Sequence, residues 1–135
     1  MVESYMVKKR ISIGQSYTRT YEKWKQNGLR DSGYFIIFNG FLDNNILQKI
    51  SGGALKLYVY LGIKSNNTTG ESFYKIETMA EYFQVNARTI TNWINELKQN
   101  NLIARYQLKF NGVSHTYLRP YDAGFRGSSN PLIRK

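Results

Sequence analysis

Apolar residues recur at helical spacing in two neighbouring segments near the middle of the chain. The spacing predicts a helix from 77 or 78 to 84, a turn filled by Val85, and a second helix over 87–99. The residues expected to face the core are Met79, Ala80 and Phe83 in the first helix and Ile90, Ile94 and Leu97 in the second. Asn86 suits the N-cap of the second helix, because its side-chain oxygen can accept from free backbone N–H groups. Two short helices joined by a tight turn predict a helix-turn-helix.

The segments before this pair predict further elements. Residues 34–38 are a β-prone apolar run, expected to be a strand or extended, and 41–50 predict a short helix with Asp43 as a possible N-cap. Ser51 can cap a longer helix, and 73–76 predict a short strand. The apolar stripe of the longer helix is Ala54, Leu57, Tyr58 and Leu61, with Lys56 and Lys64 pointing elsewhere.

Alternating residues after the second helix predict a hairpin turning at Asn111-Gly112. A two-residue turn there separates an apolar from a polar face, whereas a slip of one residue would mix them. Pro120 is expected to end the second strand. The expected pairs are Phe110 with Val113, Leu108 with His115 and Tyr106 with Tyr117 on one face, and Lys109 with Ser114 and Gln107 with Thr116 on the other.

The polar, basic residues 1–33 contain an aromatic stripe. Tyr17, Tyr21 and Trp24 fall at i, i+4 and i+7 and predict a helix over 16–27, with Gly28 available as its C-terminal cap. The stripe is consistent with packing on the body of the domain, with a dimerisation helix, and with an arm that touches DNA. The sequence leaves these three alternatives open.

These elements predict one α+β domain of the winged helix-turn-helix class, with a three-helix core and a C-terminal β-hairpin wing. Its expected bounds are 34–121. Residues 1–33 form a basic N-terminal extension with a short helix, and residues 122–135 a flexible basic tail.

Charge favours an anionic partner. The chain has 135 residues, 19 Lys and Arg against 9 Asp and Glu, and a net charge of +10. Residues 1–42 carry +4, residues 43–84 are neutral, and residues 85–135 carry +6. A membrane surface is not favoured, because no stretch approaches the roughly 18 apolar residues of a transmembrane span. The N-terminus has no apolar segment typical of a secretory signal, and without cysteine there is no disulfide framework, so a cytoplasmic location is expected.

Catalytic and metal-binding patterns are missing from the sequence. It contains no GxxxxGK[ST] phosphate loop and no HxxxH or HExxH pair. The single histidine, His115, falls on the apolar face of the predicted hairpin and is expected to be packed. The sequence therefore favours neither an enzyme nor a cofactor or metal site.

The second helix of the pair has the side chains that base recognition uses. Its polar residues cluster within about 40° of the side opposite Ile90. Arg can contact guanine with two hydrogen bonds, and Asn or Gln can do so with adenine. We expect base contacts from Arg88, Asn92, Asn95 and Gln99, flanked by Thr89 and Thr91, whereas Trp93 is expected to pack.

Basic residues beside this helix suit the DNA backbone, where they position a protein and carry the salt dependence of binding. Three of them, at 8–10, suit a basic arm that enters a minor groove. The expected backbone contacts are Lys98, Arg105, Lys109, Arg119, Lys8, Lys9 and Arg10.

Three segments carry a family resemblance: GYFIIFNGFLD at 33–43, SGGALKLYVYLG at 51–62, and KIETMAEYFQVNARTITNWINELKQNNLI at 75–103. They resemble the N-terminal winged-helix domains of replication initiator and replisome-organiser proteins of Gram-positive plasmids and phages, including the DnaD-like group. Such motifs often have glycine where this chain has Gln84. Residues 1–33 and the tail lie outside the resemblance.

The resemblance implies a protein that binds an origin or an operator of a mobile element, as a dimer on repeated sites, with 87–99 as recognition helix and 104–118 as wing. Composition and spacing by themselves support only binding to double-stranded DNA. A transcriptional repressor and a protein-interaction or oligomerisation module of a larger replisome factor remain alternatives.

Overall fold

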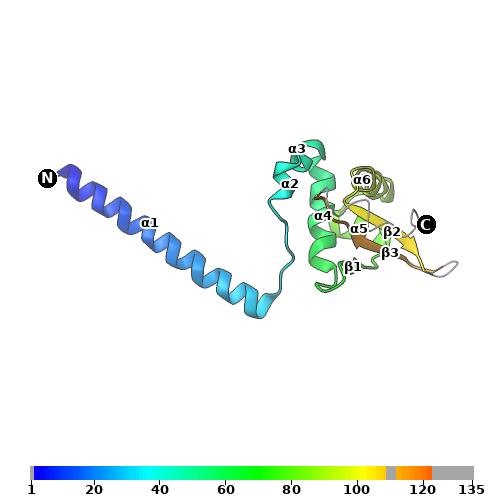
Figure 1. Ribbon diagram of the computed structural model, residues 1–135, viewed down its shortest axis with the longest axis horizontal. Helices are drawn as coiled ribbons and strands as arrows, with labels where there is room; N and C mark the ends of the chain where they lie inside the picture. The colour runs from blue at the N-terminus through cyan, green and yellow to red at the C-terminus, as the bar shows by residue number, and fades with distance from the viewer. Residues whose placement is uncertain (1, 109–111, 123–135) are drawn as a thin grey trace. The chain divides into compact units, whose positions relative to one another are not determined.

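The computed structural model describes residues 2–108 and 112–122, whose helices and strands are shown in Figure 1. The chain divides into two units, Met1–Tyr34 and Phe35–Lys135. The first unit holds α1 (Val2–Asn27) and a π-helix, η1 (Gly28–Ser32). The second holds α2 (Gly40–Asp43), α3 (Ile46–Lys49), α4 (Gly52–Lys64), β1 (Glu71–Ser72), α5 (Ile76–Phe83), α6 (Ala87–Gln99), β2 (Ile103–Gln107) and β3 (Ser114–Leu118).

Helix α1 is much longer than the predicted 16–27. It begins at Val2 and ends at Asn27 as predicted, and from Gly28 the chain continues into η1. The turn comes at Gly33, which has a φ of 79° and whose N–H donates to the Gly28 carbonyl at 3.1 Å. Positive φ is readily available to glycine. No residue of α1 is buried, and its apolar side chains are exposed along its whole length.

The prediction of one helix over 41–50 was wrong. Two four-residue helices occupy this segment, because Asn45 between them adopts the left-handed conformation with a φ of 59°. Asp43 is the last residue of α2 and does not cap a helix. Phe41 and Ile46, one from each helix, are buried in the core.

Residues 34–38 lie in neither a helix nor a strand. The backbone N–H of Phe38 donates to the Tyr121 hydroxyl at 2.5 Å, and the Phe35 ring meets Tyr58 edge to face, with 6.2 Å between centroids. Side chains from α4 and from the end of the described chain therefore hold this segment.

Helices α4, α5 and α6 supply most of the core, as the apolar spacing predicted. Ser51 caps α4 as expected, since its hydroxyl accepts from the Ala54 N–H at 3.2 Å. Phe83 is the one predicted core residue that stays half-buried. The buried residues of the three helices are Ala54, Leu57, Tyr58, Leu61, Gly62, Met79, Ala80, Ile90, Ile94 and Leu97.

Two contacts join α6 to the first turn of α4. The indole of Trp93 lies against Gly53, where a Cβ atom would collide with its ring. The Glu96 carboxylate accepts from the backbone N–H of Ser51 at 2.5 Å and from its hydroxyl at 2.7 Å. These contacts hold α6 at a defined rotation on α4, and the expectation that Trp93 packs is confirmed.

The strands form an antiparallel sheet in the order β1-β3-β2. Strand β1 lies earlier than the predicted 73–76. In Figure 1 the longer strands β2 and β3 lie side by side next to the helices of the same unit.

The predicted register between the two long strands was wrong by two residues. Tyr106 pairs with His115 and Gln107 with Ser114, where Tyr117 and Thr116 were expected. Residues 108–113 separate the strands, and the expected pairs of Lys109 and Phe110, with Asn111 of the turn, lie outside the described residues. A shift of two residues keeps every side chain on its own face, because side chains alternate with a period of two.

The sheet packs its more polar face on the helices. Ser72, Ile103 and Thr116 are buried, and the Arg105 guanidinium donates to the Thr116 hydroxyl at 2.6 Å. The aromatic face, with Tyr106 about half exposed, points outward. The described residues form an α+β fold consistent with a winged helix-turn-helix.

Replacing Gly53 with alanine is expected to destabilise the protein, because the new methyl group would force the Trp93 indole out of place. Overpacking of this kind typically costs about 1–3 kcal/mol. Gly52→Ala is the matched control, since nothing lies within 4 Å of a Cβ there, and alanine is a better helix former than glycine. Urea denaturation followed by circular dichroism gives the free energy of unfolding. Equal stability of the two variants would contradict the close approach of α6 to α4.

Candidate nucleic-acid interface

The turn between α5 and α6 shows why glycine suits the position that Gln84 occupies in this chain. Gln84 ends α5 in the left-handed conformation, with φ 56° and ψ 46°. A glycine reaches this conformation without strain, and another residue reaches it at a cost. Its N–H donates to the Glu81 carbonyl at 3.2 Å, and the Val85 N–H donates to Ala80 at 3.1 Å, so the last turn of α5 is closed.

Asn86 caps the first turn of α6 as predicted. Its side-chain oxygen accepts from the Thr89 N–H at 2.8 Å and from the Thr89 hydroxyl at 2.9 Å. Its extended backbone changes the chain direction immediately before α6. The structure confirms the predicted bounds of this helix.

One side of α6 is buried and the other is exposed. Ile90, Ile94 and Leu97 face the core, so the polar residues half a turn away face outward. These outward residues are Arg88, Asn92, Asn95 and Gln99, and all four are exposed, as is Lys98 beside them. Their side chains make no hydrogen bond or ion pair with another described residue.

The two threonines predicted to flank this row are half-buried. Thr89 donates its hydroxyl to Asn86, so its oxygen can still accept but its proton is already used. Thr91 keeps part of its surface open beside Asn92.

The predicted backbone contacts are spread over several elements. Arg105 is half-buried on the helix-facing side of the hairpin, and burial lowers the pKa of its guanidinium from the ordinary value. Arg119 is half-exposed, and its backbone N–H donates to the Leu102 carbonyl at 2.9 Å. Lys109 lies outside the described residues.

A shallow cavity of about 350 Å³ at the start of α5 brings in a residue that the sequence analysis missed. Lys75, at the N-cap, lines it together with Arg105, Ser114 and one acidic residue, Glu77. The first N–H groups of a helix have no intrahelical acceptor, and the N-cap residue Lys75 makes no side-chain hydrogen bond to those of α5, so this helix end favours an anion. A basic residue directly before a predicted helix was the available sequence signal.

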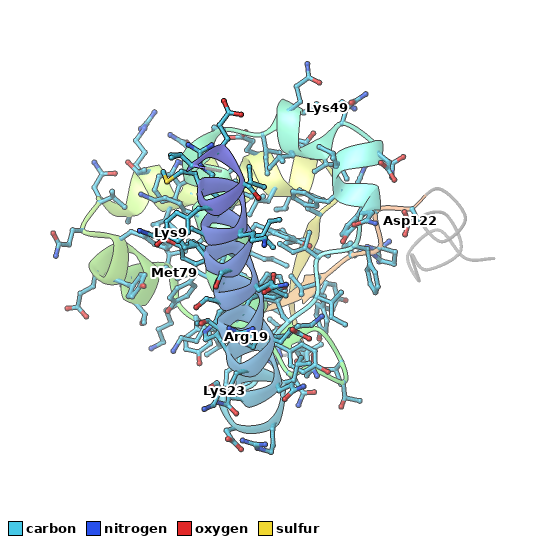
Figure 2. The ribbon with its side chains drawn as sticks, turned by 90° about the vertical axis from the view of Figure 1, so that its left-hand side faces the viewer. Lys9, Arg19, Lys23, Lys49, Met79 and Asp122 are labelled. Atoms are coloured by element: carbon cyan, nitrogen blue, oxygen red, sulfur yellow. The ribbon has the colours of Figure 1, made fainter. Side chains whose placement is uncertain are left out.

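The basic residues at 8–10 belong to a helix and not to an extended arm. Lys9 is shown on α1 in Figure 2, with Arg19 and Lys23 further along the same helix. A helix with its side chains is about 10–12 Å wide, and the minor groove of B-DNA is only about 6 Å wide. The expected entry of Lys8, Lys9 and Arg10 into a minor groove therefore does not suit α1, although these exposed residues can still meet phosphates.

His115 lies in a polar cluster on the outward face of the sheet. Its Nδ1 pairs with the Glu71 carboxylate, and Tyr117 donates to the same carboxylate at 3.4 Å. Partial burial and the Glu71 carboxylate raise the pKa of Tyr117. Phe73 packs against the imidazole, with 5.5 Å between ring centroids. His115 is therefore half-buried, paired and packed, as expected for a structural residue.

Two properties of the described residues bear on other functions. No group of three or more His, Cys, Asp and Glu side chains in 2–108 and 112–122 is placed to hold a metal ion. In the same part of the chain, every helix is too short or too polar to cross a membrane.

Residues 48–103 match a family model described as a helix-turn-helix domain. The match includes the whole of α4, α5 and α6. Neither a curated protein nor a solved structure matches the chain. Domains of this kind are typically non-catalytic. The chain thus contains a helix-turn-helix domain at residues 48–103, and such a domain implies DNA binding.

Proposed function

We propose that this protein recognises a specific sequence of double-stranded DNA by placing α6 in the major groove. The observation that carries the proposal is the exposed row of Arg88, Asn92, Asn95 and Gln99, whose side chains have no partner among the described residues. The helix-turn-helix match supports DNA binding in general. The sequence specificity is our inference from the chemistry of the row.

The row has the length and the chemistry for base recognition. Arg88 and Gln99 are eleven residues apart, about 16 Å along the helix axis, which corresponds to about five base pairs at 3.4 Å each. The Arg88 guanidinium suits the O6 and N7 acceptors of guanine, and the amides of the row suit adenine. Thr89 and Thr91, beside the row, would contact a phosphate or a thymine methyl group.

Phosphate contacts would come from both sides of α6. We assign Lys75 and Arg105 to a phosphate at the start of α5, together with the free N–H groups of that helix. Glu77 in the same cavity limits this attraction and helps to fix where the phosphate sits. The remaining candidates are Lys98, Lys109 and Arg119 in the C-terminal half, and Lys8, Lys9 and Arg10 in α1.

We further propose that the DNA site is an origin of replication of a plasmid or phage, bound by two copies on repeated sequences. The resemblance to initiator and replisome-organiser domains supports this role. A repressor would use the same α6 chemistry and would differ only in where its site lies.

Selection of binding sites from genomic fragments is the experiment that separates these roles. Repeated sites beside an AT-rich segment are expected for an origin-binding protein. Enrichment of single sites over promoters would favour a repressor. Enrichment of no sequence would overturn specific recognition and favour a protein-interaction module with non-specific DNA adhesion.

Arg88→Ala and Asn92→Ala are each expected to weaken binding to the selected duplex by about 1–3 kcal/mol, which is roughly 5- to 150-fold. Both side chains are exposed, so the fold should persist, and circular dichroism checks it. Fluorescence anisotropy with a labelled duplex measures the affinity. Asn67→Ala, in the exposed loop after α4, is the control and should bind as the wild type does. Unchanged affinity in both α6 variants would contradict base recognition by this row.

Lys75→Ala is expected to weaken binding to specific and random duplexes by the same factor, since phosphates carry no sequence information. The slope of log affinity against log salt concentration should become shallower by about 0.9 for one lost phosphate contact. Anisotropy titrations at several salt concentrations measure the slope. A loss confined to the specific duplex would contradict a phosphate contact. The same slope change is expected for Lys109→Ala.

A further inference from the structure

An apolar groove of about 550 Å³ lies between α4 and α5, and no residue of α6 lines it. Its floor comes from one stripe of α4, at i, i+4 and i+8, and from two aromatic residues at the end of α5. The apolar residues that line it are Leu55, Val59, Tyr60, Ile63, Tyr82 and Phe83.

The apolar side chains of this groove are more exposed to solvent than those of the core. The buried stripe of α4 includes Leu57 and Leu61 and faces the other way, whereas Ile63 in the groove is 65% exposed and Tyr82 is 67% exposed. The rings pack on one another, with the Tyr60 centroid 5.0 Å from that of Tyr82 and 5.5 Å from that of Phe83. A contiguous exposed apolar surface of this kind is typical of an interaction site.

Two lysines mark the ends of the groove. The ammonium of Lys56 lies 5.9 Å from the centroid of the Phe83 ring. That of Lys64 lies 5.9 Å from the Tyr60 centroid and 5.7 Å from the Tyr74 centroid. Cation–π attraction holds both charges beside the apolar floor. The lysines are eight residues apart on α4, which is about 12 Å along its axis, and the groove lining includes no carboxylate to neutralise them.

We propose that this groove binds an acidic amphipathic helix of a partner protein. Two turns of such a helix span about 11 Å, so apolar side chains at i, i+3, i+4 and i+7 would cover the floor. A carboxylate at each end would meet Lys56 and Lys64. This is the helix-in-groove mode of recognition, in which the apolar anchors give affinity and the charges select the partner.

Charge argues against this chain as its own partner. Residues 1–42 carry a net charge of +4 and residues 85–135 carry +6, so both terminal regions would be repelled by the lysines. If two copies met groove to groove, the lysines of one groove would face the lysines of the other and repel them. An acidic helix is the partner whose charge complements the groove.

The groove and the proposed DNA surface share no residue. The groove is formed by α4 and α5, whereas the exposed row of Arg88, Asn92, Asn95 and Gln99 lies on α6. A partner helix can therefore bind while α6 is on DNA, and the inference holds whether or not α6 reads a specific sequence.

A synthetic helical peptide of about 14 residues tests the proposal, with leucines at i, i+3, i+4 and i+7 and glutamates one turn before and after them. It is titrated into the full-length, nitrogen-15-labelled chain and followed by NMR. Saturable shifts at Leu55, Ile63 and Tyr82 are expected. Absence of saturable binding, or equally tight binding of a peptide with serine in place of each leucine, would overturn the proposal.

Variants with matched charge separate the groove from general electrostatic attraction. Lys56→Gln with Lys64→Gln should weaken peptide binding about five- to tenfold, whereas Lys23→Gln with Lys25→Gln on α1 should change it less than twofold. Ile63→Ser, at an exposed position, should weaken it as well. Equal losses in the two lysine pairs would overturn the proposal. Sedimentation equilibrium showing a dimer that Ile63→Ser dissociates would overturn it too, by assigning the groove to a second copy.

Discussion

The rotation of α6 about its own axis depends on its contact with the first turn of α4. The Trp93 indole occupies the space that Gly53 leaves open, and the Glu96 carboxylate holds Ser51 at the same helix end. Successive residues of a helix are about 100° apart around its axis. If α6 were rotated about its axis by one residue, part of its polar row would be buried. The packing of Trp93 on Gly53 thus acts together with the buried Ile90, Ile94 and Leu97 to fix which side chains face outward.

The helix arrangement places three surfaces of different chemistry on one small domain. The outward side of α6 presents one guanidinium and three amides, and the start of α5 presents free N–H groups beside Lys75. The groove on α4 and α5 is apolar between two lysines. Because the three surfaces use different residues, binding at one leaves the others open, which suits a protein that joins DNA to a second macromolecule.

The hairpin shows how a correct face assignment can accompany a wrong register. Alternation placed Tyr106 and His115 on one face and Gln107 and Thr116 on the other, and the structure has the same faces with pairs shifted by two residues. The pattern repeats every two residues, so it excludes a slip of one and permits a slip of two. The pattern also did not show that the polar face packs inward, where Thr116 is satisfied by Arg105.

The sequence by itself determined the elements that local interactions stabilise. Helices α4, α5 and α6, the caps at Ser51 and Asn86, and nearly all of their buried residues follow from spacing at i, i+3 and i+4 and from side chains that reach their own backbone. Tertiary structure decided the strand register and the cavity beside Lys75. It also decided the contact of Trp93 with Gly53, forty residues away in the chain. These features arise where segments distant in sequence meet, and the side-chain pattern within one segment does not specify the surface it will meet. The length of α1 and the break at Asn45 are local features that the apolar spacing did not show.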